Sequence, residues 1–206
     1  MHHNFSGTGI AIVTPFLKGG GVDFIGLEKL LNHIIEGGVD YIVVLGTTGE
    51  SVVLSADEKI AVTNFVKETV DGRKTLVMGV GGNNTCAVAD TIKNTDLSGY
   101  DAILSVSPYY NKPTQEGIYQ HYKALSAISP LPIIMYNVPG RTSSNMSAET
   151  TLRLAHDFDN IIAVKEASGN LDQIIKIIKD RPEGFLVISG DDALTLPMIY
   201  MGADGV

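Results

Sequence analysis

The chain has 206 residues, a formal net charge of −8 and a pI of about 5.0. This length is enough for one domain with a hydrophobic core, and 44% hydrophobic and 18% charged residues are typical of a globular protein. An acidic chain without a cluster of Lys and Arg is unsuited to binding nucleic acid. No apolar run approaches the ~20 residues that span a bilayer, and the first residues lack the features of a signal peptide. With a single cysteine, Cys86, these features predict a cytoplasmic protein without a membrane partner.

Short apolar runs alternate with longer amphipathic stretches along the chain. The runs predict strands at 9–14, 41–45, 75–79, 102–106, 132–136, 161–165 and 185–189. They are almost continuously apolar, which is typical of strands buried on both faces. The stretches between them predict helices at 23–36, 55–70, 84–96, 114–128, 147–156, 170–179 and 192–201. Ser55 and Glu58 form a capping-box pattern at the start of the second helix, and Cys86 is expected in the core or at its boundary.

Seven strand–helix units predict an α/β fold, a TIM (β/α)8 barrel, as a single catalytic domain over residues 1–206. The residues GADGV at 202–206 read as the beginning of an eighth strand. A complete barrel has ~250 residues, so the barrel is expected to be truncated within that strand. The first and seventh strands are then expected to carry unpaired edges.

The residues that follow each strand are the candidates for a functional site, because such barrels carry their sites at the carboxyl ends of the strands. Hydroxyl groups, one Lys and one Arg fall at these ends. The segments concerned are 46–51 (GTTGES), 107–110 (SPYY), 136–142 (YNVPGRT), 165–166 (KE) and 189–192 (SGDD).

Lys165 is the most informative of these residues because it closes a buried apolar strand. Burial disfavours the charged ammonium and lowers its pKa, and a neutral amine is the nucleophile that forms a Schiff base with a ketone. The hydroxyls of Tyr136, Thr47 and Tyr110 are suited to the proton transfers that this chemistry needs. The alternative is a Lys165 that reaches solvent or pairs with Glu166.

Two further groups are suited to holding an anionic substrate. The 46–51 loop offers hydroxyls and backbone N–H groups for a carboxylate, or is a simple turn. Arg141 is suited to gripping a carboxylate through two parallel hydrogen bonds, or forms a surface salt bridge. The five histidines and Cys86 show no metal-ligand spacing, and Gly79, Gly81 and Gly82 do not complete a dinucleotide fingerprint.

The motifs GTTGES at 46–51, SPYYNKPTQEG at 107–117, YNVPGRT at 136–142, VKEASGN at 164–170 and SGDD at 189–192 resemble, in order, the dihydrodipicolinate synthase family. The resemblance covers nearly the whole chain. It implies the condensation of pyruvate with L-aspartate 4-semialdehyde in lysine biosynthesis through diaminopimelate. It also implies no metal and no organic cofactor, and usually a homotetramer.

The resemblance assigns roles to the catalytic candidates. Lys165 matches the Schiff-base lysine and Tyr136 the proton-relay tyrosine. Thr47 would link Tyr136 to Tyr110, which in the family reaches into the site of a neighbouring subunit.

The same resemblance assigns the binding residues. Thr48 and the adjoining backbone would hold the pyruvate carboxylate, Arg141 the semialdehyde carboxylate, and Gly190 would line the pyruvate pocket. Many members are inhibited by lysine at a subunit interface. Those positions fall on Ser51, Ala56, Lys59, Asn83, Ala87 and Tyr109, and the residues at 56, 59 and 87 depart from the lysine-sensitive pattern.

Two other functions fit the same residues. The first is a sister pyruvate lyase, such as N-acetylneuraminate lyase or a keto-deoxy-sugar-acid aldolase, which shares the lysine and the tyrosine. Arg141 and the double threonine at 47 and 48 favour the synthase. The second is an inactive, truncated fragment or binding protein that keeps these residues without turnover.

Overall fold

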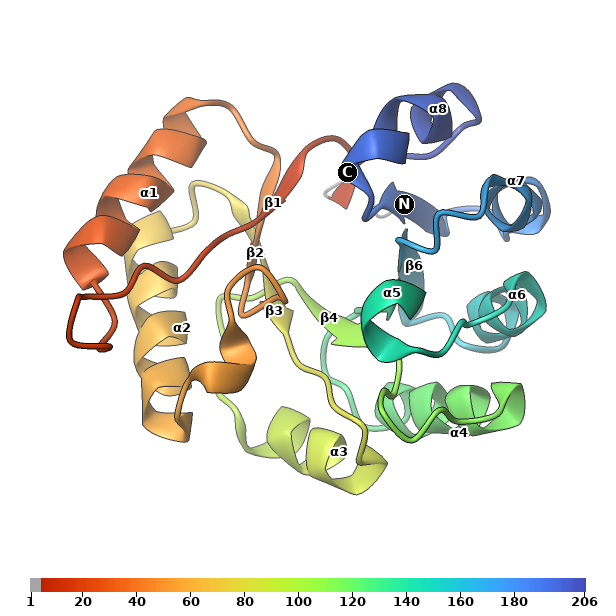
Figure 1. Cartoon of the computed structure of the whole chain (residues 1–206), viewed down its shortest axis with the longest axis horizontal. Coiled ribbons are helices and arrows are strands. Elements are labelled where there is room, and N and C mark those ends of the chain that lie inside the picture. Colours follow the sequence, from red (N-terminus) through yellow and green to blue (C-terminus); the bar gives the residue numbers. More distant parts are fainter. Residues whose placement is uncertain (1–4) are drawn as a thin grey trace.

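The computed structural model describes residues 5–206 as alternating strands and helices (Figure 1). The strands are β1 (Gly9–Ala11), β2 (Tyr41–Val44), β3 (Thr75–Gly79), β4 (Ala102–Val106), β5 (Ile133–Asn137), β6 (Ile161–Glu166) and β7 (Leu186–Ser189). The main helices are α1 (Phe24–Glu36), α2 (Ala56–Val70), α3 (Thr85–Asn94), α4 (Gln115–Ser126), α6 (Ala148–Asp157), α7 (Leu171–Asp180) and α8 (Thr195–Tyr200). Each predicted strand is therefore confirmed, although the first is shorter than expected, and each predicted helix except the last is confirmed with small shifts at the ends.

The strands form one parallel sheet in the order β1 to β7, and the helices surround it, as a (β/α)8 barrel requires (Figure 1). The edges of the sheet are not left unpaired, which corrects the expectation from the sequence. Gly205 bridges in parallel to Gly7 on one side and to Ile188 on the other. A β-carbon at Gly205 would lie 2.2 Å from the carbonyl oxygen of Gly7, so only glycine allows this close approach. Residues 204–206 thus occupy the position of an eighth strand.

Side-chain caps begin most of the helices. Ser55 and Glu58 form the predicted capping box of α2, and Asn84, Thr114, Ser147 and Asn170 accept hydrogen bonds from backbone N–H groups at the starts of α3, α4, α6 and α7. A Ser, Thr or Asn at the N-cap therefore fixes where each of these five helices begins.

The structure differs from the predicted elements in three places. Two short helical segments, η2 (Ser51–Val53) and α5 (Pro139–Thr142), were missed because three or four residues carry no periodic pattern. The helix predicted at 192–201 is divided into η3 (Asp192–Leu194) and α8. Cys86 is exposed rather than part of the core, because α3 buries the face that carries Val88 and Ile92.

The core has two layers, and strand alternation assigns each residue to one of them. Inside the barrel lie Ile134 and Tyr136 of β5. The outer layer, between sheet and helices, contains Ile133 and Met135 of the same strand. At the carboxyl ends of β5 and β6, Tyr136 and Lys165 therefore face the interior, while the next residues face the helices.

Candidate active site

Lys165 lies on β6 directly across from Tyr136 on β5, with which it pairs in the ladder. Its amine is 5.2 Å from the centre of the Tyr136 ring, and apolar side chains of the barrel interior surround its stem. Burial lowers the pKa of Lys165, and the carboxylate of Asp192 opposes this shift only in part. The environment thus favours the neutral amine more than water does.

Glu166 is not the partner of Lys165, although it is the next residue. The carboxylate of Glu166 is fully buried on the other face of β6 and accepts hydrogen bonds from Asn137, Ser168 and Gln173. The alternative in which Glu166 pairs with Lys165 is therefore wrong.

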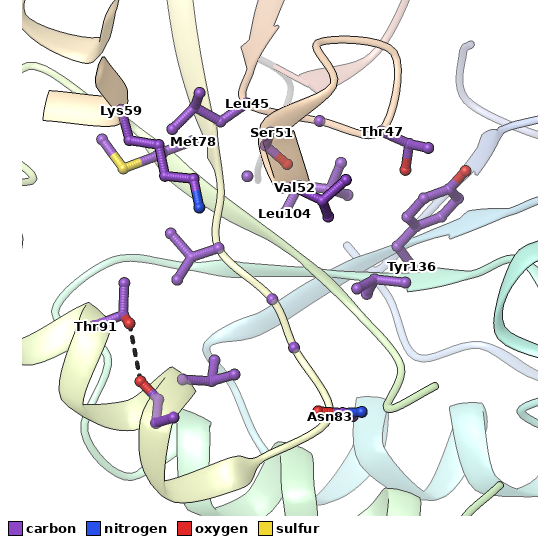
Figure 2. Close-up of a pocket in the computed structure, with 18 of the residues that line it drawn as sticks. Leu45, Thr47, Ser51, Val52, Lys59, Met78, Asn83, Thr91, Leu104 and Tyr136 are labelled. Atoms are coloured by element: carbon purple, nitrogen blue, oxygen red, sulfur yellow. Dashed lines mark hydrogen bonds between the residues drawn. The ribbon is translucent and has the colours of Figure 1, made fainter. Parts of the chain in front are cut away.

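Tyr136 joins the barrel interior to a cavity of about 830 Å³. Its phenol points toward the hydroxyl of Thr47, and both residues line this cavity together with Arg141 (Figure 2). Burial raises the pKa of Tyr136 above its usual value, while Arg141 and the Thr47 hydroxyl favour the phenolate. The phenol remains protonated at neutral pH and is available as a proton donor.

The loop of residues 46–51 carries Thr47 and Thr48 and has a fixed backbone. Leu45 and Glu50 take left-handed conformations with φ of 57° and 51°. The hydroxyl of Thr14 donates a hydrogen bond of 2.7 Å to the carbonyl of Gly49 in a buried position. The N–H groups of Gly49 and Glu50 are bonded inside the loop. Thr47 and Thr48 are both exposed to solvent.

Arg141 lies in the helical turn α5, which Pro139 begins. It lines the same cavity as Tyr136, and none of the ion pairs formed by residues 5–206 involves it. The alternative of a surface salt bridge is thus not seen in this part of the chain. A guanidinium in a cavity wall is suited to an anionic ligand.

Gly190 lies beside Lys165 at the end of β7. A β-carbon at this position would be 3.0 Å from Lys165 Cε and 3.0 Å from Ala167 Cβ. Because Gly190 has no side chain, the methylene stem of Lys165 has room beside it.

The comparisons with known proteins bear directly on this site. The sequence profile of the Dihydrodipicolinate synthetase family matches residues 4–206. The chain belongs to this family. It is 57% identical to 4-hydroxy-tetrahydrodipicolinate synthase of Flavobacterium psychrophilum over 202 residues. This alignment covers 98% of this chain and 69% of that protein.

Solved structures of the family have the same fold. The chloride-inhibited dihydrodipicolinate synthase of Acinetobacter baumannii, complexed with pyruvate, matches with a TM-score of 0.93 and 44% identity, over 97% of this chain and 68% of that one. The synthase of Cyanidioschyzon merolae with lysine bound matches with a TM-score of 0.94 and 44% identity, over 99% of this chain and 70% of that one. The predicted resemblance and barrel fold are confirmed.

The structure of this Dihydrodipicolinate synthetase family member brings together most, but not all, of the predicted site residues. Thr47, Tyr136 and Arg141 line one cavity, and Lys165 and Gly190 adjoin Tyr136 inside the barrel. Thr48 follows in the same loop. Tyr110 lies apart: its side chain is 84% exposed, and its backbone is left-handed with φ of 72°. Tyr109, not Tyr110, lines the cavity.

Two features of the site were missed from the sequence. Asp192 acts on Lys165 across the loop after β7, which spacing alone does not reveal. The buried bonds between Asn137 and Glu166 join residues 29 positions apart in the sequence, and no single motif contains both residues. Strand alternation is the signal that finds them.

Two classes of feature are not seen in the described part of the chain. Within residues 5–206, no three His, Cys, Asp or Glu side chains converge as metal ligands would. His2 and His3 lie outside the described residues. No helix in the same range is long and apolar enough to cross a membrane.

Proposed function

We propose that this chain catalyses the Schiff-base condensation of pyruvate with L-aspartate 4-semialdehyde, a lyase reaction of lysine biosynthesis through diaminopimelate. The observation that carries the proposal is the amine of Lys165, half-buried in the barrel 5.2 Å from the centre of the Tyr136 ring. The relatives are named for 4-hydroxy-tetrahydrodipicolinate synthase, and one solved relative is complexed with pyruvate.

Lys165 acts as the nucleophile. Its neutral amine adds to the keto carbon of pyruvate, and the keto oxygen takes up a proton to give a carbinolamine. Loss of water then gives the protonated imine. Loss of a proton from the pyruvyl methyl group gives an enamine, whose carbon adds to the aldehyde carbon of the second substrate. The lowered pKa of Lys165 favours the first step, because it raises the fraction of neutral amine.

Tyr136, Thr47 and Tyr110 form the proton relay. The Tyr136 phenol donates and recovers protons at the carbinolamine, and the Thr47 hydroxyl next to it is the following member. Tyr110 acts at the site of a neighbouring copy, since in its own chain it projects into solvent.

The carboxylates of the substrates are held at different positions. Thr48 and the adjoining backbone hold the carboxylate of pyruvate, which is bonded as an imine to Lys165 beside Gly190. Arg141, on the wall of the larger cavity, holds the carboxylate of the semialdehyde. No metal or organic cofactor takes part, because an amine and hydroxyl groups are sufficient for this chemistry.

The chain functions as a homo-oligomer, and a homotetramer is the arrangement we propose. Several exposed apolar side chains occur in groups rather than singly, and two of these groups are suited to contacts between copies. Val52, Val53 and Ile60 lie near η2 and α2, in the region of the 46–51 loop, and Leu196, Ile199 and Tyr200 lie on α8. Two separate apolar surfaces provide for two kinds of contact between copies. The proposed location is the cytoplasm, as the single cysteine suggests.

Borohydride trapping with pyruvate tests the proposal. The intact chain should gain a reduced pyruvyl adduct, and peptide mapping should place it on Lys165. Lys165→Ala should remove the adduct, and Lys165→Arg should also remove it because a guanidinium stays protonated. An adduct on another lysine contradicts the assignment, and no adduct at all favours the inactive binding protein.

The second substrate separates this function from that of a sister lyase. Condensation should be seen with aspartate 4-semialdehyde, and cleavage of N-acetylneuraminate or of a keto-deoxy sugar acid should not. Efficient cleavage of a sugar acid, with the pyruvate adduct retained, identifies the sister activity instead.

A further inference from the structure

A fully buried carboxylate lies directly after Lys165, on the outer face of β6. Both oxygens of Glu166 are 3.1 Å from the side-chain nitrogen of Asn137, which follows Tyr136 on β5. The backbone N–H of Ser168 donates to Glu166 at 2.7 Å, and the amide of Gln173 at 3.1 Å. Burial raises the pKa of Glu166, but these donors favour the carboxylate, which accepts from all of them.

The same network extends to the segment behind Arg141. The side-chain oxygen of Asn137 accepts a hydrogen bond of 2.9 Å from the N–H of Met146. Its nitrogen is 2.9 Å from the side-chain oxygen of Asn145, whose own amide donates to Gln173 at 2.8 Å. Asn137 therefore ties the end of β5 to the turn that leads out of α5.

Backbone bonds join the pair to the strands on either side. The N–H of Ala167 donates to the carbonyl of Asn137, and the N–H of Gly190 donates to the carbonyl of Glu166, both at 2.8 Å. In the ladder, Asn137 pairs with Glu166 as Tyr136 pairs with Lys165. Because successive side chains point to opposite faces, fixing the outer pair fixes the direction of the inner pair.

We propose that the buried Asn137–Glu166 pair is a positioning device that sets Tyr136 and Lys165 face to face and anchors the segment carrying Arg141. The inference rests on the proposed function, which gives Lys165 and Tyr136 their roles. Neither Asn137 nor Glu166 lines the cavities in which Tyr136, Arg141 and Lys165 lie, so the pair acts through its neighbours and is not itself catalytic.

Physical reasons support a role beyond stability. A buried carboxylate without a cation is costly and persists only where several donors satisfy it. This carboxylate is satisfied at the carboxyl end of the barrel, beside the two residues that must meet the substrate. A displacement of about 1 Å in a reacting group lowers a rate by roughly 10²-fold, so small errors in this register are expected to be visible in kcat.

Two variants and a matched control test the proposal. Glu166→Gln keeps the shape of the side chain but replaces one acceptor oxygen by an NH2 group, which is itself a donor, among groups that donate to this position. Asn137→Ser removes the amide from which both Glu166 oxygens accept hydrogen bonds. The control is Asn160→Ala, because Asn160 bonds to Ser126 beside the opposite end of β6. For each, kcat, the KM for pyruvate and Tm are measured on the whole chain.

Glu166→Gln and Asn137→Ser should each lose roughly ten-fold or more in kcat, with a smaller change in the KM for pyruvate. Asn160→Ala should lower Tm by a similar amount and keep kcat within about two-fold, because the amino end does not position reacting groups. Unchanged kcat in both variants, or an equal loss in Asn160→Ala, overturns the proposal.

A labelling measurement separates this inference from the proposed function. Reductive methylation with formaldehyde and cyanoborohydride at a series of pH values, followed by peptide mapping, gives the pH midpoint of Lys165 labelling without any pyruvate. In Asn137→Ser the midpoint should move to higher pH, because a loosened Lys165 is less buried while Asp192, the carboxylate acting on it, is unchanged. An unmoved midpoint together with unchanged kcat refutes positioning. A missing pyruvate adduct on Lys165 in the unaltered chain refutes the proposed function instead.

Discussion

Gly190 packs against the stem of Lys165 so closely that a β-carbon at position 190 would lie 3.0 Å from Lys165 Cε and 3.1 Å from its Cγ. The backbone at 190 cannot move away easily, because its N–H is bonded to the carbonyl of Glu166 at 2.8 Å. Gly190 is not among the glycines with positive φ, so space rather than conformation requires a glycine here.

Gly190→Ala should therefore displace the amine of Lys165 by a few tenths of an ångström without straining the backbone. We expect the rate of pyruvate imine formation to fall by roughly ten-fold or more, because reacting groups tolerate little misplacement. Borohydride quenching at timed intervals measures this rate. Gly19→Ala is the control, since nothing lies within 4 Å of that position. Equal rates in the two variants would contradict the role of Gly190.

Tyr136→Phe and Thr47→Val remove hydroxyl groups from the cavity and leave most of the packing intact. General acid–base steps contribute ~10²–10⁴ in rate, so kcat should fall strongly while the KM for pyruvate changes less. Tyr110→Phe should have the same kind of effect only if a second copy brings Tyr110 to the site, since it is exposed in the single chain. A Tyr136→Phe variant with near-normal kcat would rule out the relay.

Arg141→Ala should damage the second substrate selectively. Hydrogen bonds to charged groups contribute about 1.5–3 kcal/mol, which corresponds to roughly ten-fold or more in the KM for aspartate 4-semialdehyde. Arg141→Lys should recover only part of this loss, because it keeps the charge but not the planar pair of donors. Pyruvate trapping should continue in both variants, and an equal loss for both substrates would be inconsistent with a selective role.

The sequence predicted the barrel because each buried strand is an apolar run followed by a capped, amphipathic helix. Lys165 and Tyr136 were predicted from the same pattern, since strand ends of a parallel barrel meet at one rim. The beginning of an eighth strand at 202–206 was also predicted, but not that Gly205 pairs with both edges of the sheet, because two single-residue bridges leave no pattern in the sequence. The sequence alone did not decide to which face of β6 the Glu166 side chain points. In the structure it points to the outer face, where its bonds to Asn137 exclude an ion pair with Lys165.

His121 makes stability depend on pH. It is 2% exposed in α4, and its Nδ1 is 2.9 Å from the hydroxyl of Thr85. Burial lowers the pKa of His121 to about 4. The folded pKa is therefore below the unfolded value of about 6.5, so protonation favours the unfolded chain. The stability that neutral His121 contributes is present above about pH 6.5 and is lost as the pH falls toward 4.

Urea unfolding at pH 7.5 and pH 5 measures this effect. The linkage relation gives a free energy of unfolding about 2 kcal/mol lower at pH 5 from this residue alone. His121→Gln cannot be protonated, so its stability should change less between the two pH values, whatever its stability at pH 7.5. The same pH dependence in the variant and the unaltered chain would show that other groups are responsible.

The cavity of about 830 Å³ is lined by all six positions that the family resemblance implies for a lysine site. They are Ser51, Ala56, Lys59, Asn83, Ala87 and Tyr109. Figure 2 shows the amine of Lys59 directed into this space from α2. Among the described residues that line the cavity, Asp90 on α3 is the one carboxylate, and Lys59 and Arg141 are the cations.

Feedback inhibition by lysine should therefore be weak or absent. Position 87 offers no carboxylate to a ligand ammonium, and Lys59 adds a like charge that repels it even where solvent weakens the effect. A lysine titration of the condensation rate should give half-inhibition above roughly 1 mM, a binding free energy weaker than about −4 kcal/mol. Ala87→Glu combined with Lys59→His should lower that concentration, because it supplies an anion and removes the fixed positive charge. Half-inhibition of the unaltered chain well below 1 mM would mean that Asp90, Tyr109 and the backbone are enough to hold the ligand, and that Lys59 turns away when lysine binds.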